Sequence, residues 1–425
     1  MTRGMEILKG VVGKIKPKFL PVTNGVMRII LLFAKFVFIV ILAKHAHPET
    51  VVQYGILVAT VSVATTFLGL DFYTFSTREI MKNPDNIGEI LTNQVAVTVC
   101  VYMSLIPFIF VTTIFVVPIF TICAIISTEH ISQELIRVLI ARRKPLLATL
   151  TLAPKAGLWI VALLIYSNVS ENIVTLDMIL IFWFLGNTIS LGLGVMVLRR
   201  DFSLVRYHHL NVVWIKKGIK AALILLGSGV LTRCLFLIDR ILMQNYAGID
   251  VASAYILFSS IFASINVVVE AVVFNFALPD LVEKYNKVNL GAFLKYSARI
   301  AFNAWAIAGS GVLSIVFFSD FFLLFIGKEV YSSQKLVLYS CAILSLVYVS
   351  YTSLHYILYS MGQDLALLLT AIATVTIFSG ISLTLSESFG PLSVVLYLIT
   401  SLIIGVVIRL LIIYNIVRRN SDRIQ

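Results

Sequence analysis

Charged residues are scarce in this sequence. Asp, Glu, Lys and Arg make up 13% of the 425 residues, whereas a soluble globular chain contains about 25%. Hydrophobic residues make up 59%, and they are gathered into runs long enough to cross a bilayer, which takes about 20 residues each. This composition excludes an ordinary soluble protein and predicts an all-α polytopic membrane protein.

Cysteine is rare as well, and its placement argues against cysteine chemistry. The four cysteines, Cys100, Cys123, Cys234 and Cys341, all lie inside apolar runs. No two of them have the spacing of metal ligands, and none lies in an expected external loop. We therefore expect no disulfide, metal site or cofactor, and we interpret the cysteines as small buried apolar residues.

Enzyme motifs and large loops are missing too. The chain has no GxxxxGK[ST] loop and no HExxH or GxSxG motif, which mark ATPases, zinc proteases and serine hydrolases. The longest loop between apolar runs is the central one, from 199 to about 216. A membrane-embedded glycosyl enzyme would be expected to carry a large external domain, so we expect a protein that is not an enzyme.

Twelve apolar runs are long enough to span a membrane. The first is longer than the roughly 7–15-residue core of a cleavable signal peptide, so we interpret it as an uncleaved helix. The segment before it, with Lys9, Lys14, Lys16 and Lys18, resembles a basic helix on the cytoplasmic surface. The predicted spans are 22–43, 51–70, 88–108, 115–140, 145–166, 173–198, 219–243, 250–276, 293–318, 333–358, 364–386 and 391–415.

Basic residues fall almost entirely on one side of these spans. With the N-terminus inside, 23 basic residues lie in cytoplasmic segments, and only Lys44, Lys328 and Lys335 lie outside. The net charge of +12 therefore follows the positive-inside rule and does not indicate a nucleic-acid surface. The asymmetry predicts both termini in the cytoplasm. The cytoplasmic set is Arg3, Lys9, Lys14, Lys16, Lys18, Arg78, Lys82, Arg142, Arg143, Lys144, Arg199, Arg200, Arg206, Lys216, Lys217, Lys220, Lys284, Lys287, Lys295, Arg299, Arg418, Arg419 and Arg423.

The basic central loop divides the spans into two sets of six. We predict two pseudosymmetric six-helix lobes, formed by residues 1–210 and 211–425. Repeats of this kind are common in transporters. Both lobes would keep the same orientation, which makes the repeat a parallel one.

Paired cations support the repeat. Arg28 and Lys35 in the first span are seven residues apart, as are Arg233 and Arg240 in the seventh. A short loop and a similar helix start follow each pair, ETVVQY in the first half and DVASAY in the second. A spacing of seven is about two helical turns, so the members of each pair share a face.

Seven cations lie within the predicted spans, where each costs about 2.5–3.5 kcal/mol at the bilayer centre. Lys35 lies near the middle of its span, so we expect it to face a water-filled cavity. Arg240 and Arg409 lie near helix ends, and we expect them to snorkel to the interface. The seven cations are Arg28, Lys35, Arg137, Lys155, Arg233, Arg240 and Arg409. The candidates for binding an anionic substrate are Arg28, Lys35, Lys155, Arg233 and Arg240.

Acidic residues within the spans are fewer, and several belong to one polar stripe. The fourth span carries Glu129, His130, Gln133, Glu134 and Arg137 on its cytoplasmic half, with spacings that place them along one side of the helix. The stripe is either a satisfied hydrogen-bond network between helices or a proton relay or gate, and it contains a histidine that titrates near neutral pH. The candidates for coupling or gating are Glu129, His130, Glu134, Arg137, Asp71, Arg78, Asp239 and Glu270.

Two segments resemble a known family. Residues 68–79, LGLDFYTFSTRE, and residues 129–143, which begin with EHISQEL and end with ARR, are similar to the corresponding positions of bacterial O-antigen flippases of the Wzx type. The layout of twelve spans around a basic central loop resembles this family over the whole chain. These flippases belong to the superfamily of multidrug, oligosaccharidyl-lipid and polysaccharide exporters.

The resemblance implies a transporter of the bacterial inner membrane that serves lipopolysaccharide synthesis. It would move undecaprenyl-pyrophosphate-linked oligosaccharide to the periplasmic leaflet by alternating access, driven by an H⁺ or Na⁺ gradient. It would work beside a polysaccharide polymerase and a chain-length regulator. Cations in a wet cavity would then bind the pyrophosphate. The alternative is a drug or small-molecule antiporter of the same superfamily, which needs an apolar, acid-lined cavity. The surplus of cations over acids within the spans favours the anionic substrate.

The topology can be tested by reporter fusions. A cytoplasm-specific reporter fused after Gln425 should be fully active, and alkaline phosphatase at the same position should be inactive. Alkaline phosphatase placed in the loop after His47 should be active and serves as the control. Phosphatase activity after Gln425 would contradict the predicted topology.

Overall fold

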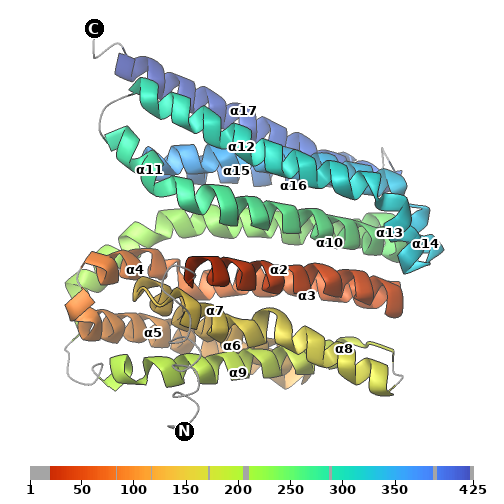
Figure 1. Ribbon diagram of the computed structural model, residues 1–425, viewed down its shortest axis with the longest axis horizontal. Helices are drawn as coiled ribbons and strands as arrows, with labels where there is room; N and C mark the ends of the chain where they lie inside the picture. Colours follow the sequence, from red (N-terminus) through yellow and green to blue (C-terminus); the bar gives the residue numbers. More distant parts are fainter. Residues whose placement is uncertain are drawn as a thin grey trace. The chain divides into compact units, whose positions relative to one another are not determined.

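The computed structural model is helical throughout its described part, which contains no strand (Figure 1). The basic segment before residue 20 lies outside this part, and so do the side chains of Arg28 and Arg78. The described residues are 20–82, 84–115, 117–170, 173–203, 210–286, 290–385 and 390–421.

A helix coincides with each of the twelve predicted spans. Helices satisfy their own backbone hydrogen bonds, which the bilayer interior demands. The fifth span combines α7 (Pro145–Ala153), the π-helix η3 (Pro154–Leu158) and α8 (Trp159–Ser170). Nine spans are single helices, α2 (Leu20–His45), α3 (Pro48–Gly69), α5 (Ile87–Phe115), α6 (Val117–Ala141), α9 (Leu176–Ser203), α12 (Leu290–Phe317), α15 (Lys335–Ser360), α16 (Asp364–Leu385) and α17 (Ser393–Ser421).

The seventh and eighth spans are joined in α10 (Val212–Val269). Its 58 residues would extend about 87 Å at about 1.5 Å per residue, far more than a hydrocarbon core of about 30 Å. Gly248 interrupts the helix with φ 81 and ψ 171, a conformation that glycine adopts readily and other residues do not. The eighth span continues through the π-helix η5 (Glu270–Phe274) into α11 (Asn275–Asn286).

Three further short helices of the described part were not predicted, because the prediction considered only long apolar runs. They are α4 (Phe72–Lys82), α13 (Ser319–Ile326) and α14 (Glu329–Ser332). The aromatic rings of Phe72 and Phe75 on α4 pack against Trp214 near the start of α10. The backbone of Gly218 approaches both rings so closely that a Cβ there would lie 2.6 Å from each.

The chain forms two compact units, which we describe separately. Unit 1 contains residues 1–38 and 61–226, and unit 2 contains residues 39–60 and 227–425. The units differ from the predicted lobes at residues 39–60 and 211–226. The division into lobes at residue 210 stays a prediction.

Glycines on α9 allow close helix packing in unit 1. A Cβ on Gly186 would lie 2.7 Å from the carbonyl oxygen of Pro154 and 2.9 Å from the Trp159 side chain. A Cβ on Gly194 would lie 2.8 Å from Leu135 on α6. Helix α9 therefore approaches both η3 and α6 at distances that only a glycine permits.

The cysteines are less uniformly buried than we expected. Cys341 is buried, Cys123 and Cys234 are partly buried, and Cys100 is exposed. Cys100 lies beside the exposed apolar Val99 on α5, so the prediction that it is buried is wrong. Cys100 lies within an apolar run because this side of α5 is both apolar and exposed.

The close packing of α9 generates a stability prediction. Gly186→Ala should destabilise the protein by about 1–3 kcal/mol, because the added methyl meets a backbone carbonyl that has little room to move. Gly192→Ala is the matched control, since nothing lies within 4 Å of its Cβ position. The thermal unfolding midpoint of the detergent-purified variants distinguishes them. Equal midpoints would contradict the described packing.

Candidate functional site

A buried ion pair lies in unit 1. The ammonium of Lys155 on η3 is 2.8 Å from the carboxylate Oε1 of Glu129 on α6. It also donates hydrogen bonds of 3.1 Å to the Ser132 hydroxyl and to the Glu129 carbonyl. The Trp183 indole donates to Oε2 of Glu129 at 3.3 Å. Lys155 is only 6% exposed, and protein oxygens compensate its charge.

The π-helix η3 positions this lysine. Proline lacks an N–H group and its ring clashes with the carbonyl of the preceding turn, and Pro154 is the first residue of η3. The wider π turn follows at once and carries Lys155. Such π segments are frequent at functional sites.

Lys35 on α2 is a second cation of unit 1, and its charge acts electrostatically on Glu129 and Lys155. Its side chain is exposed, unlike that of Lys155, and it has no ion pair or hydrogen bond among the described residues. Glu129, Lys155 and Lys35 together carry one excess positive charge. Of these three side chains, that of Lys35 is the exposed one.

The remainder of the stripe on α6 forms a second cluster. Glu134 makes an ion pair with Arg137 and accepts a hydrogen bond of 2.7 Å from Gln94 on α5. The Arg137 guanidinium lies 3.4 Å from the ring centroid of Tyr73 on α4. The stripe thus forms two polar clusters among the described residues, and each is compatible with a structural network or with part of a proton relay.

His130 is completely buried beside this cluster. Its Nδ1 is 3.1 Å from the Tyr102 hydroxyl, and its Nε2 has no hydrogen-bond partner among the described residues. Nε2 lies 3.8 Å from the Glu134 carboxylate. Gly69 at the end of α3 leaves room for the ring, because a Cβ there would lie 3.2 Å from Nε2. A ring nitrogen without a partner next to a carboxylate suits proton uptake.

The predicted coupling residue Asp71 lies in the turn between α3 and α4. Leu70 and Asp71 have φ values of 48 and 50, a left-handed backbone that costs a non-glycine residue about 1–3 kcal/mol. The Asp71 carbonyl accepts hydrogen bonds from the amide and the hydroxyl of Thr74. These bonds begin α4, so the structure gives Asp71 a backbone role at a strained turn.

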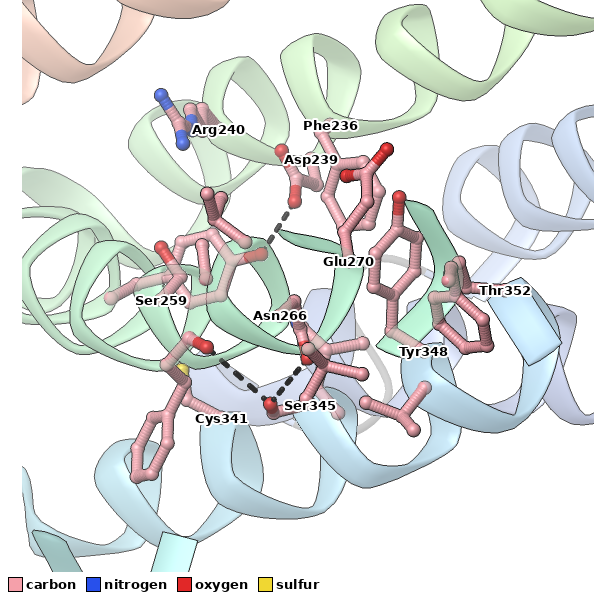
Figure 2. A pocket seen from close by; sticks show the side chains of 18 residues that line it. Phe236, Asp239, Arg240, Ser259, Asn266, Glu270, Cys341, Ser345, Tyr348 and Thr352 are labelled. Atoms are coloured by element: carbon pink, nitrogen blue, oxygen red, sulfur yellow. Dashed lines mark hydrogen bonds between the residues drawn. The ribbon is translucent and has the colours of Figure 1, made fainter. Parts of the chain in front are cut away.

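Unit 2 contains a cavity of about 230 Å³ with two carboxylates in its wall (Figure 2). Asp239 on α10 is 1% exposed and accepts a hydrogen bond of 2.5 Å from the Tyr255 hydroxyl. Its Oδ1 has no hydrogen-bond partner among the described residues. Glu270 is the first residue of η5 and accepts a hydrogen bond of 2.9 Å from Tyr356.

The rest of the cavity wall is largely apolar. Figure 2 shows Asn266 and Ser345 joined by a hydrogen bond, in which the Ser345 hydroxyl donates to the Asn266 amide oxygen at 3.2 Å. Aromatic side chains complete the lining, among them Phe236, Phe262 and Tyr348. The cavity wall therefore combines apolar side chains, acceptor oxygens and the Arg240 guanidinium. The carboxylates could bind a desolvated cation or a proton in competition with that guanidinium.

The two arginines of the seventh span have different environments. The Arg240 guanidinium donates a hydrogen bond to the carbonyl of Gly55 on α3. Gly55 also lets α3 pack closely against Ile256, since a Cβ there would lie 2.4 Å from its side chain. Arg233 is exposed and interacts electrostatically with Tyr348 in the cavity wall. Arg240 is therefore held inside unit 2, contrary to the expected snorkelling.

Arg409 was also expected to snorkel, and that prediction is wrong. Its side chain on α17 is 0% exposed. It donates hydrogen bonds of 2.7 Å to the Tyr351 carbonyl and 3.2 Å to the Thr370 hydroxyl. Its guanidinium also lies 3.5 Å from the Tyr351 ring centroid. These contacts link α15, α16 and α17, and they hold the Arg409 side chain in the interior of unit 2.

The described cations within the spans fall into two groups. Lys35 and Arg233 are exposed, while the others are buried or partly buried against acids and carbonyls. Sequence reasoning did not identify the hydrogen-bond partners of Glu129, His130, Glu134 and Asp239, although each partner is a polar residue within an apolar run. The missed partners are Gln94, Tyr102, Trp183 and Tyr255, and the hydrogen-bonded pair Asn266 and Ser345 in the cavity wall was missed as well.

Comparisons with known proteins identify the fold. No family model and no curated protein matches the chain. The chain is similar to the inward-facing conformation of a multidrug resistance MATE family transporter of the MOP superfamily, with a TM-score of 0.71 and 11% identity over 92% of this chain and 95% of that one. An outward-facing conformation of such a transporter gives a TM-score of 0.63 and 11% identity over 94% of each chain.

A third solved structure extends the likeness. The MATE transporter ClbM in complex with Rb⁺ gives a TM-score of 0.61 and 10% identity over 95% of each chain. Identities this low establish the fold alone. The predicted fold class, an all-α polytopic membrane protein of about twelve transmembrane helices, is confirmed.

The buried ion pair of unit 1 generates a stability prediction. Lys155→Met leaves the Glu129 carboxylate without its closest cation and should cost of the order of 3 kcal/mol. The double variant Lys155→Met/Glu129→Gln removes both charges and should recover most of this loss. Thermal unfolding of the purified variants measures both effects. A single variant as stable as the unmodified protein would contradict the pairing.

Proposed function

We propose that this chain, which has the fold of the MATE transporters, is a flippase for undecaprenyl-pyrophosphate-linked oligosaccharide repeat units. It moves them from the cytoplasmic to the periplasmic leaflet of the bacterial inner membrane, and it is a transporter rather than an enzyme. Solved structures of this fold are described as inward-facing and outward-facing, which supports alternating access. The distribution of 23 cytoplasmic against three external basic residues supports two cytoplasmic termini.

The observation that carries this proposal is the exposure of Lys35. A cation at membrane depth is expensive, and the buried cations Lys155 and Arg409 are covered by protein oxygens. An exposed cation in such a place is stable in a wet cavity, where an anionic substrate supplies the counter-charge. Lys and Arg both bind pyrophosphate, Arg through two parallel hydrogen bonds.

The cavity of unit 2 suits the coupling ion. Asp239 presents one carboxylate oxygen without a described partner, and Glu270 lies in the same wall. H⁺ or Na⁺ binding there would neutralise the buried negative charge of Asp239. Because the bound ion would favour one conformation of unit 2 over another, the ion gradient would be coupled to the conformational change. The complex of the similarly folded ClbM with Rb⁺ supports cation binding by this fold.

A second candidate function rests on the same cavity. An apolar wall with two carboxylates also suits a small aromatic cation, which is the substrate chemistry expected of a drug antiporter. In that case the protein would export such cations and Lys35 would have no substrate to bind. Efflux of ethidium from cells that express the protein separates the two functions, because a flippase of anionic lipid-linked sugars should not change it.

The flippase function predicts a loss of surface polysaccharide in specific variants. In a bacterial strain that lacks its own flippase, expression of this protein should restore surface polysaccharide if the sugars are compatible. Lys35→Ala and Arg233→Ala should each reduce the restored amount at least tenfold, because each removes a counter-charge for the pyrophosphate. Lys35→Arg should retain part of it.

The control for these variants is Lys217→Ala, which removes an exposed cation near the start of α10. It should restore as much polysaccharide as the unmodified protein at a matched protein level. Full restoration by both Lys35→Ala and Arg233→Ala would contradict the cationic site.

A further inference from the structure

Helices α6 and α9 of unit 1 end beside each other in a patch of basic residues. Arg142, the residue after α6, makes an ion pair with Asp201 in the last turn of α9, with Nη2 3.1 Å from Oδ1. Leu139 on α6 and Leu198 on α9 belong to one buried apolar cluster just before these ends. Residues 138–145 and 196–203 contain five cations and a single acid, Asp201. The five cations, which we call the basic patch, are Arg142, Arg143, Lys144, Arg199 and Arg200.

The positive charge of the basic patch is only partly compensated by protein. Asp201 is 7% exposed, and its carboxylate is held by Arg142. Arg143 and Arg199 are exposed, and their side chains make no ion pair or hydrogen bond within the described part of the chain. The patch therefore offers at least two guanidinium groups to an external anion.

The backbone at Arg143 is better suited to glycine. Arg143 has a φ of 56, the left-handed conformation that costs other residues free energy and that glycine usually adopts after the end of a helix. The amides of Arg143 and Lys144 donate hydrogen bonds to the carbonyls of Ile140 and Leu139, as a glycine at this position would also allow. The turn itself thus gives no reason for an arginine, and what the arginine adds is its cationic side chain.

The basic patch follows directly on apolar surface that faces lipid. Ile140 on α6 and Val195 on α9 are 38% and 47% exposed, and a large apolar side chain exposed on a membrane-spanning helix contacts lipid tails. Arg199 is four residues beyond Val195 and so lies on the same side of α9, one turn further along. Cations at the end of a lipid-facing surface lie at the level of the headgroups.

We propose that the basic patch at the ends of α6 and α9 binds the phosphate headgroup of an anionic phospholipid. Arginine binds phosphate through two parallel hydrogen bonds, and basic pockets between helices at the cytoplasmic face bind anionic headgroups. A zwitterionic phospholipid carries the same phosphate together with a cationic group, which the patch repels. The predicted topology places this lipid in the cytoplasmic leaflet. The site is independent of the transported substrate.

The test is a lipid titration of the full-length protein purified in detergent, followed by its thermal unfolding midpoint. A ligand that binds only the folded protein raises the midpoint once its concentration exceeds the dissociation constant, so the titration gives an apparent affinity. Dioleoyl phosphatidylglycerol should raise the midpoint clearly, and dioleoyl phosphatidylcholine, with the same acyl chains, should raise it much less. Inorganic phosphate at the same concentration should leave it unchanged, because it has no acyl chains to hold it at the micelle surface.

Variants assign the binding to the patch. Arg143→Gly/Arg199→Gln should weaken the apparent affinity for phosphatidylglycerol at least tenfold, because each cation near the surface attracts the anionic lipid. The matched control is Lys216→Gln/Lys217→Gln, which removes two exposed cations near the start of α10 at the same predicted membrane face. It should bind like the unmodified protein.

The single variant Arg143→Gly separates binding from folding. Glycine adopts the left-handed conformation without strain, so the midpoint of this variant in phosphatidylcholine should equal or exceed that of the unmodified protein. Its apparent affinity for phosphatidylglycerol should nevertheless fall severalfold. Arg143→Lys keeps the charge and should keep most of the affinity.

Four outcomes would overturn the proposal. The first is an equal response of the unmodified protein to the two lipids. The second is full affinity for phosphatidylglycerol in Arg143→Gly/Arg199→Gln. An equal loss of affinity in Lys216→Gln/Lys217→Gln would reveal a general effect of net charge. A shift with inorganic phosphate as large as that with phosphatidylglycerol would identify a site for a soluble anion instead of a lipid.

Discussion

The cost of placing a charge in the hydrocarbon core is the constraint on which this structure depends. An isolated ion there has no water to solvate it, so it must be paired, hydrogen-bonded or exposed to a wet space. Lys155 and Arg137 meet this requirement with the carboxylates of Glu129 and Glu134. Arg409 meets it with a carbonyl, a hydroxyl and an aromatic ring. Lys35 is exposed, and it is the cation for which we propose an anionic substrate as the counter-charge.

Local departures from regular helix coincide with charged groups. The π-helix η3 carries Lys155 and the π-helix η5 begins with Glu270, so each unit presents a candidate site residue from a widened turn. Glycines have the complementary effect. Gly69 gives space to His130, and Gly55, whose carbonyl accepts a hydrogen bond from Arg240, gives space to Ile256. Irregular backbone of this kind weakens a helix, and its concentration beside the polar clusters indicates a functional reason for keeping it.

Most of the fold could be predicted from the sequence, because bilayer thickness imposes a length and an apolar composition on each span. All twelve predicted spans coincide with helices. The short helix α4 was missed because its amphipathic pattern covers only eleven residues and its partners Trp214 and Gly218 are distant in sequence. The loop at Gly248 was expected, but the shape of the joined helix α10 was not.

The site could be predicted only in part, because its contacts join residues that are distant in sequence. Residue type and helical spacing identified Glu129, Glu134, Lys155, Asp239 and Glu270 as candidates. Which cation pairs with which acid depends on contacts between helices, and spacing along one helix carries no information about them. Arg409 illustrates this limit, because its position near a helix end indicated snorkelling while helices α15 and α16 enclose it. The partners Trp183 and Tyr255 gave no signal beyond a polar atom in an apolar run.

The central claim is that the exposed cations serve an anionic lipid-linked substrate. The most direct measurement reconstitutes the purified protein in liposomes that carry a fluorescent undecaprenyl-pyrophosphate-linked oligosaccharide in both leaflets, and it bleaches the outer label with a membrane-impermeant reductant. The account predicts that the protein lets the reductant bleach the inner-leaflet label too, and that Lys35→Ala and Arg233→Ala do not. Inner-leaflet label that stays protected as in protein-free liposomes, together with ethidium uptake by the same vesicles, would contradict the account and favour the drug antiporter.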